Sequence, residues 1–156
     1  MSPAPLKVFR SSGRAGFTAE VAGNPRHVKA RKLEREVRVR FTDAACTVQT
    51  QEGLVHARPG DAILSGVGGE QWRVSRVRFA EKYRPWPPTH AGEPGVYLSL
   101  RYAILALQMP EPFQVWLADG MSRLDGRAGD WLVDYGDGSL GIVGPATFAS
   151  TYEITD

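Results

Sequence analysis

The chain has 156 residues, 42% of them hydrophobic and 23% charged, which is the balance of a water-soluble protein with one domain or two small ones. It has no apolar run near the roughly 18 residues that a membrane span needs and no secretory signal pattern, so we expect no contact with a membrane. The single cysteine, Cys46, excludes an internal disulfide and a cysteine-rich zinc cage. We therefore expect a cytoplasmic protein that holds no metal and no cofactor.

The net charge of +2 is unevenly distributed along the chain. Residues 1–85 carry 16 Lys/Arg against 8 Asp/Glu, whereas residues 86–156 carry 3 against 9. This asymmetry favours a basic face for an anionic partner, or two halves that attract each other when they pack.

Residues 1–27 form an N-terminal extension, in which we expect a mobile first dozen residues and one strand within GFTAEVAG, residues 16–23. After it, apolar residues alternate with arginines over residues 37–41, which predicts a strand with one wet, basic face. Arg38 and Arg40 share that face. The next strand begins at Cys46, whose thiol we expect to be buried.

Turn chemistry follows at Pro59-Gly60-Asp61, and Gly68-Gly69 predicts a hairpin with a two-residue type I′ turn. Phe79 and Tyr83 lie four residues apart and so share one face of a short helix, for which Ser75 is the expected N-cap.

The same pattern returns later in the chain. Residues 60–83 align with residues 129–152 without a gap, and seven of the 24 positions are identical. Asp137-Gly138 then predicts the second type I′ turn, and Pro145 suits the first position of the second helix. Upstream, residues 28–41 align with residues 96–109 at an offset of 68.

We interpret this pattern as a duplication. Its first copy, residues 28–84, is basic, and its second copy, residues 96–156, is acidic; residues 85–95 form a linker with four prolines and two glycines. The predicted fold is mainly β with short helices. Each copy is a half-barrel or barrel-like unit closed by a helical turn, and the two share one core because a unit of this size is marginal alone.

The segments RPGDAILSGVGGEQWRVSRVRFAEKYRP (58–85) and RAGDWLVDYGDGSLGIVGPATFASTYEI (127–154) carry a resemblance. They are similar to the C-terminal signature of small, uncharacterised phage and prophage proteins, in which Pro-Gly-Asp and an aromatic residue precede Phe and Thr-Tyr-Glu. The second copy matches with Trp131 and Tyr152, whereas the first has Ala62 at the aromatic position. The resemblance implies a phage-related origin, and counteraction of host defence is one role in that setting.

The basic copy supplies the candidate ligand-binding residues. Guanidinium groups bind phosphates and carboxylates bidentately, and nearby aromatic rings could stack on bases. The candidates are Arg31, Arg38, Arg40, Trp72, Arg73, Arg76 and Tyr83. We expect a non-enzymatic binding protein whose partner is an anionic small molecule, such as a nucleotide, or a host protein. Nucleic acid is the less favoured partner, and the chain could form a homo-oligomer.

Two alternatives remain open. Asp61 and Asp130 recur at the same place and, with a histidine, could serve a small hydrolase or transferase. An aspartate after glycine at the entry to a strand more often binds its own backbone in an Asx-turn, and His27, His56 and His90 show no metal-ligand spacing. The second alternative is a structural component of a virion.

Overall fold

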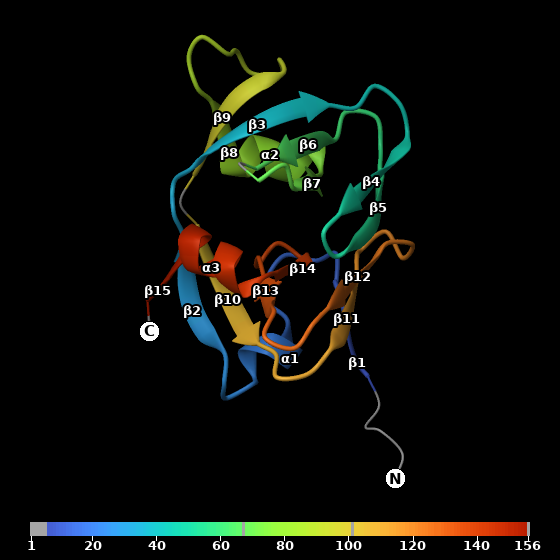
Figure 1. Ribbon diagram of the computed structural model, residues 1–156, viewed down its shortest axis with the longest axis vertical. Helices are drawn as coiled ribbons and strands as arrows, with labels where there is room; N and C mark the ends of the chain where they lie inside the picture. Colours follow the sequence, from blue (N-terminus) through green and yellow to red (C-terminus); the bar gives the residue numbers. More distant parts are fainter. Residues whose placement is uncertain (1–5, 67, 101, 156) are drawn as a thin grey trace. The chain divides into compact units, whose positions relative to one another are not determined.

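The computed structural model describes residues 6–66, 68–100 and 102–155. The chain divides into two compact units: unit 1 comprises residues 1–31 and 103–156, and unit 2 comprises residues 32–102. Regular structure is mostly strand, with short helices, which confirms the predicted mainly β fold (Figure 1). Within the described part no sheet closes into a barrel, and no described helix is long and apolar enough to cross a membrane.

Unit 2 contains a five-stranded antiparallel sheet in the order β7-β6-β3-β9-β8, a separate hairpin of β4 and β5, and one helix. The elements are β3 Glu36–Phe41, β4 Cys46–Thr50, β5 Gly53–Ala57, β6 Ala62–Ser65, β7 Gln71–Val74, α2 Arg76–Lys82, β8 Tyr83–Pro85 and β9 Gly95–Ser99. Helix α2 buries Phe79 against Val37, Val39 and Tyr97 on one face of this sheet. Phe79 also stacks on Tyr83, with ring centroids 4.9 Å apart, but Tyr83 is the first residue of β8 and not, as predicted, part of the helix.

Unit 1 contains a five-stranded sheet in the order β14-β13-β10-β2-β15 and a three-stranded sheet in the order β1-β11-β12. The elements are β1 Lys7–Arg10, α1 Ala19–Ala22, β2 Val28–Lys32, β10 Ala103–Gln108, β11 Phe113–Trp116, β12 Arg123–Gly126, β13 Trp131–Asp134, β14 Leu140–Val143, α3 Pro145–Thr151 and β15 Tyr152–Ile154. Pro145 occupies the first turn of α3, as predicted.

Two expectations for the N-terminal extension are wrong. Residues 1–5 lie outside the described residues, but β1 pairs in parallel with β11 and is therefore not mobile. The expected strand within residues 16–23 is instead the short helix α1. Between these two elements the chain is held by tertiary contacts, because Gly13 and Gly16 donate their N–H groups to the carbonyls of the loop after β13 at 2.8 Å.

The two five-stranded sheets have the same connectivity but exchange one strand. In each sheet a β-hairpin is followed along the chain by a helix. The hairpin is β6-β7 before α2 in unit 2 and β13-β14 before α3 in unit 1. The remaining interior strand comes from the other predicted copy. Strand β2 pairs with β10 in unit 1, and β9 pairs with β3 in unit 2 (Figure 1). The compact units are therefore not the same divisions of the chain as the predicted copies.

The hydrogen bonds correct the alignment of the upstream strands. Thr42 N–H donates to Asp61 O at 3.0 Å in unit 2, and Met109 N–H donates to Asp130 O at 2.9 Å in unit 1. Thr42 and Met109 are 67 residues apart, so the predicted offset of 68 is wrong by one residue. A shift of one residue moves every side chain to the other face of a strand. The residues equivalent to Arg38 and Arg40 are consequently Leu105 and Leu107.

Both predicted hairpins form, but without type I′ turns. That turn needs positive φ at both central residues, whereas only the second residue of each pair has it, with φ of +82° at Gly69 and +91° at Gly138. Asp134 pairs with Leu140 across a loop of five residues, and Ser65 pairs with Gln71 in the same way. Each longer loop therefore has a left-handed glycine at Gly69 or Gly138, and the loop of unit 1 has a second one at Gly136, with φ of +75°.

The strand exchange also redistributes charge. Unit 2 carries 11 Lys/Arg against 8 Asp/Glu, a net of +3, and unit 1 carries 8 against 9, a net of −1. The difference in net charge is larger between the two predicted copies than between the two compact units. One reason is that β2 brings Lys29 and Arg31 into the acidic unit 1.

The segment between β8 and β9 is held by Tyr97. Its hydroxyl accepts from Gly92 N–H at 3.1 Å and donates to Glu93 O at 2.7 Å. Because the Tyr97 side chain lies on the α2 face of the sheet, residues 90–93 are tied to that face.

Burial raises the pKa of Tyr97 above its usual 10.0, with a smaller contribution from the negative charge of Glu93. A raised pKa means that the folded state favours the neutral phenol. The resulting stabilisation is complete below pH 10.0 and is lost as the pH rises through the folded-state value. We therefore expect the melting temperature to fall less steeply above pH 10.0 in Tyr97→Phe than in the wild type, as measured by circular dichroism. Equal slopes would contradict this assignment.

Candidate functional site

Arg38 and Arg40 lie on the exposed face of β3, the central strand of unit 2. Both arginine side chains are exposed, whereas Val37 and Val39 point to the opposite face of the sheet and are buried under α2. The alternation in the sequence therefore predicted this face correctly. Within the described part of the chain, neither arginine has an ion pair or a side-chain hydrogen bond. Two cationic groups are thus presented to solvent without a partner.

The neighbouring strands frame this pair with polar and apolar side chains. Ser65 of β6 and Val96 of β9 lie directly opposite Arg38, one on each side. Ile63 lies opposite Arg40 and is fully buried by the β4–β5 hairpin through Val48 and Ala57. We call this surface, comprising Arg38, Arg40, Ser65 and Val96, the basic face of unit 2.

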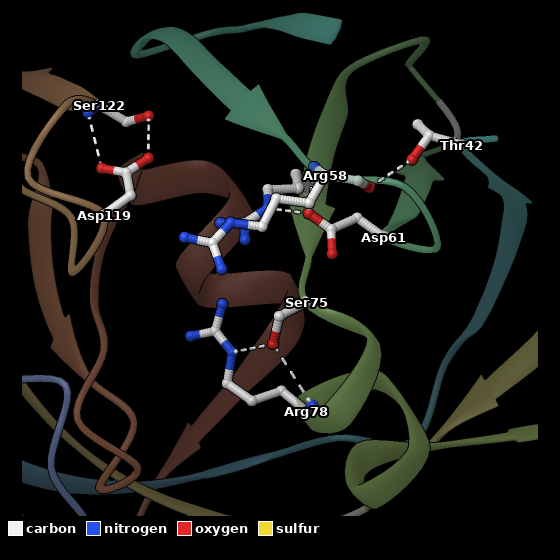
Figure 2. Close-up of polar contacts among 8 residues, drawn as sticks. Thr42, Arg58, Asp61, Ser75, Arg78, Asp119 and Ser122 are labelled. Atoms are coloured by element: carbon white, nitrogen blue, oxygen red, sulfur yellow. Dashed lines mark hydrogen bonds and ion pairs between the residues drawn. The ribbon is translucent and has the colours of Figure 1, made fainter. Parts of the chain in front are cut away.

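Arg73 of β7 lies opposite Ile63 on the same face of the sheet, but its side chain forms an ion pair with Asp61. Arg73 Nε donates to Asp61 Oδ2 at 2.8 Å, and the side chains are only 14% and 6% exposed. Arg58 N–H donates to the same oxygen at 2.8 Å (Figure 2). The carboxylate is therefore saturated at this oxygen by one cation and one backbone donor.

Asp61 closes a tight turn rather than the predicted Asx-turn. The Asp61 N–H donates to Arg58 O at 3.0 Å, and the Asp61 carboxylate accepts from Arg58 N–H. An Asx-turn would instead use a backbone N–H further along the chain. Gly60 has φ of +90°, which glycine adopts without strain. Thr42, the residue after β3, donates its Oγ1 hydroxyl to Arg58 O at 2.7 Å and so fixes the turn (Figure 2).

Unit 1 repeats the turn without the cation. Asp130 Oδ2 accepts from Arg127 N–H at 2.9 Å, and Gly129 has φ of +94°. Among the residues that the structure describes, neither Asp61 nor Asp130 has a histidine partner, and no group of three His, Cys, Asp or Glu could hold a metal ion. The geometry therefore favours a structural role for both carboxylates over acid–base chemistry.

The other candidate residues do not gather on the basic face. Trp72 packs against the core on the α2 side of the sheet, and Tyr83 is only 6% exposed in that core. Arg31 belongs to unit 1 and forms an ion pair with Glu153 at 3.0 Å. Arg76 is exposed at the start of α2, beside Gly60. The predicted combination of arginines with stacking rings on one surface is therefore not assembled.

Two further residues differ from expectation. Cys46 is exposed at the first position of β4, although strand alternation places it on the same face as the buried Val48 and Thr50. Lys32 is buried, with its Nζ 3.3 Å from Tyr83 Oη and 5.3 Å from the centre of that ring. Its position at the end of β2, where the chain passes from one unit to the other, is not visible in the residue pattern.

The equivalent face of unit 1 is covered by the N-terminal extension. Leu105 and Leu107 are 8% and 4% exposed. Helix α1 packs on β10 with Val21 fully buried. Thr18 donates its N–H and its hydroxyl to Asp134 Oδ2 at 2.7 and 3.1 Å, and Asp134 is equivalent to Ser65. Sequence reasoning missed Ser65, although the gap-free alignment of residues 60–83 with 129–152 already places it over this buried aspartate.

Comparison with known proteins completes the description. Neither a curated protein nor a solved structure matches the chain. A family model described as PGDYG protein matches residues 53–153, which is more than half of the chain and includes both Gly-Asp turns. The chain therefore belongs to the PGDYG protein family.

Proposed function

We propose that the protein is a non-enzymatic binding protein and that the basic face of unit 2 binds an anionic partner. One observation carries the proposal: Arg38 and Arg40 are exposed and unpaired, while the equivalent Leu105 and Leu107 of unit 1 are buried on β10, the strand against which α1 packs. The same surface is thus sealed in one unit and left open and cationic in the other.

The chemistry of the face suits phosphate or carboxylate groups. Residues two apart on a strand are about 6.6 Å apart along its axis, so the two guanidinium groups can bind adjacent anionic groups of one partner. Arginine retains its charge at any physiological pH and presents a planar fork of donors to such groups. The Ser65 hydroxyl beside Arg38 adds a further donor.

The origin and setting form the second part of the proposal. Equal connectivity, paired Gly-Asp turns and matching hydrogen bonds at offsets of 67 and 69 support an internal duplication. The resemblance of residues 58–85 and 127–154 to phage and prophage proteins supports a phage-related protein that acts in the cytoplasm.

A thermal-melt series tests the binding proposal. We expect nucleotides, acidic peptides or both to raise the melting temperature of the full chain. At a concentration about 100 times the dissociation constant the stabilisation is about 2.7 kcal/mol, which for a chain of this size is a shift on the order of 5–10 °C. Arg38→Ala/Arg40→Ala should abolish this shift, because both guanidinium groups are removed.

The matched control removes two exposed arginines from unit 1. Arg26→Ala/Arg127→Ala changes the net charge by the same amount and leaves the basic face intact, so it should retain the shift. Equal loss in both variants would show that net charge alone drives binding. The absence of a shift with every anionic compound would contradict the proposal.

A further inference from the structure

The covered face of unit 1 shows how a polypeptide segment docks on this sheet. Residues 16–22 place the buried side chain of Val21 on β10, and Thr18 donates two hydrogen bonds to the Asp134 carboxylate. Asp134 accepts a third from Gly136 N–H at 3.0 Å. The segment is thus held by the Val21 side chain, by the Thr18–Asp134 hydrogen bonds and by the backbone hydrogen bond from Gly16 N–H to Gly136 O.

Unit 2 offers the corresponding positions to an occupant of different chemistry. Arg38 and Arg40 replace the buried leucines of β10, the strand on which α1 packs, and Ser65 replaces Asp134, which binds Thr18. The chain segment that precedes β9 does not cover them, because Tyr97 holds residues 90–93 on the α2 face. An occupant of this face must carry acidic groups where Val21 is apolar, since burying an unpaired guanidinium group is unfavourable.

The surrounding charge favours an acidic peptide over a nucleic acid. Glu36 is exposed on the same face of β3, two residues from Arg38, and it repels a continuous phosphate backbone. The net charge of unit 2 is only +3, whereas nucleic-acid binding relies on many cationic contacts to phosphates. A peptide can place one or two carboxylates at the arginines and neutral groups beside Glu36.

We propose that a short acidic segment of another protein docks over Arg38, Arg40 and Ser65 in the way that residues 16–22 dock in unit 1. This inference rests on the proposed function and narrows its partner from any anion to a polypeptide. The carboxylates of the segment bind the two guanidinium groups, and the Ser65 side chain bonds to its backbone.

The test selects short random peptides on the immobilised full chain and, in parallel, on Arg38→Glu/Arg40→Glu. We expect Asp- and Glu-rich peptides on the wild type and Lys- and Arg-rich peptides on the charge-reversed variant. The selected acidic peptides should bind at least about tenfold more weakly to Arg38→Ala/Arg40→Ala in fluorescence titrations, because charge-assisted hydrogen bonds are lost. Binding to Arg26→Ala/Arg127→Ala should be unchanged.

A single-stranded oligonucleotide with the same net charge as the peptide distinguishes the peptide proposal from the more general proposal of anion binding. Weaker oligonucleotide binding, together with arginine-dependent peptide binding, supports the peptide. Tighter oligonucleotide binding that is lost in Arg38→Ala/Arg40→Ala overturns the peptide but leaves the anion-binding function in place. If neither probe depends on these arginines, both proposals fail.

Discussion

Replacing Asp61 with alanine is expected to destabilise the protein by about 3–5 kcal/mol. The change leaves the Arg73 guanidinium group, which is only 14% exposed, without its carboxylate, and an uncompensated buried charge accounts for most of such a loss. It also removes the acceptor of Arg58 N–H and so loosens the turn that begins β6. Chemical denaturation followed by circular dichroism measures this change.

Unit 1 supplies the matched comparison for Asp61. Asp130 occupies the equivalent turn but accepts from one backbone N–H and has no cation partner, so Asp130→Ala should cost only about 1 kcal/mol. Asp61→Asn retains an acceptor and loses the charge, and its loss should fall between the two; it also keeps the test usable if Asp61→Ala does not fold. Arg73→Met should recover part of the loss when added to Asp61→Ala. Equal losses for Asp61→Ala and Asp130→Ala would contradict the ion-pair account.

Cutting the chain between β8 and β9 should leave its two pieces firmly associated. A specific protease sequence inserted between Ala91 and Gly92 allows the folded full chain to be cut. Each piece contributes an interior strand to the sheet of the other, β2 beside β10 and β9 beside β3. Separation therefore requires both sheets to be disrupted. We expect light scattering to give the mass of the intact chain until a denaturant unfolds the sheets.

Salt distinguishes strand exchange from charge attraction between the copies. At about 1 M salt the Debye length is about 3 Å, and attraction between exposed charges is largely screened. The cut chain should stay associated under these conditions, because backbone hydrogen bonds and buried side chains hold each exchanged strand. Dissociation of the folded pieces in salt, or at any salt concentration without unfolding, would refute the exchange.

Local patterns predicted much of the fold. Alternation identified β3 and its exposed arginines, the Phe79–Tyr83 spacing identified α2, and Pro145 marked the start of α3. The exchange of β2 and β9 was not predictable in this way, because it depends on which distant strands pair and both pairings satisfy the same local pattern. The offset error at β3 has a related cause: an alignment of apolar residues placed Val37 over Leu105, whereas hydrogen-bond register places Arg38 there.

The candidate site was predicted only in part. The free face of Arg38 and Arg40 follows from a period of two, which is a local property of the chain. Trp72 and Tyr83 were grouped with the arginines by proximity in the sequence, but the register places both side chains on the core side of the sheet. The burial of Arg73 with Asp61 and the covering of unit 1 by residues 16–22 depend on tertiary contacts.

The most direct measurement of the central claim is a nuclear magnetic resonance titration of the isotopically labelled full chain. The probes are a nucleoside triphosphate and an oligoglutamate peptide, and the signals are the Nε–Hε groups of the arginines together with the backbone amides. We predict saturable changes centred on Arg38, Arg40 and Ser65, with the equivalent Leu105 and Asp134 unaffected because α1 covers them. Changes spread evenly over the exposed arginines of both units, or centred away from β3, would show that the basic face of unit 2 is not a binding surface.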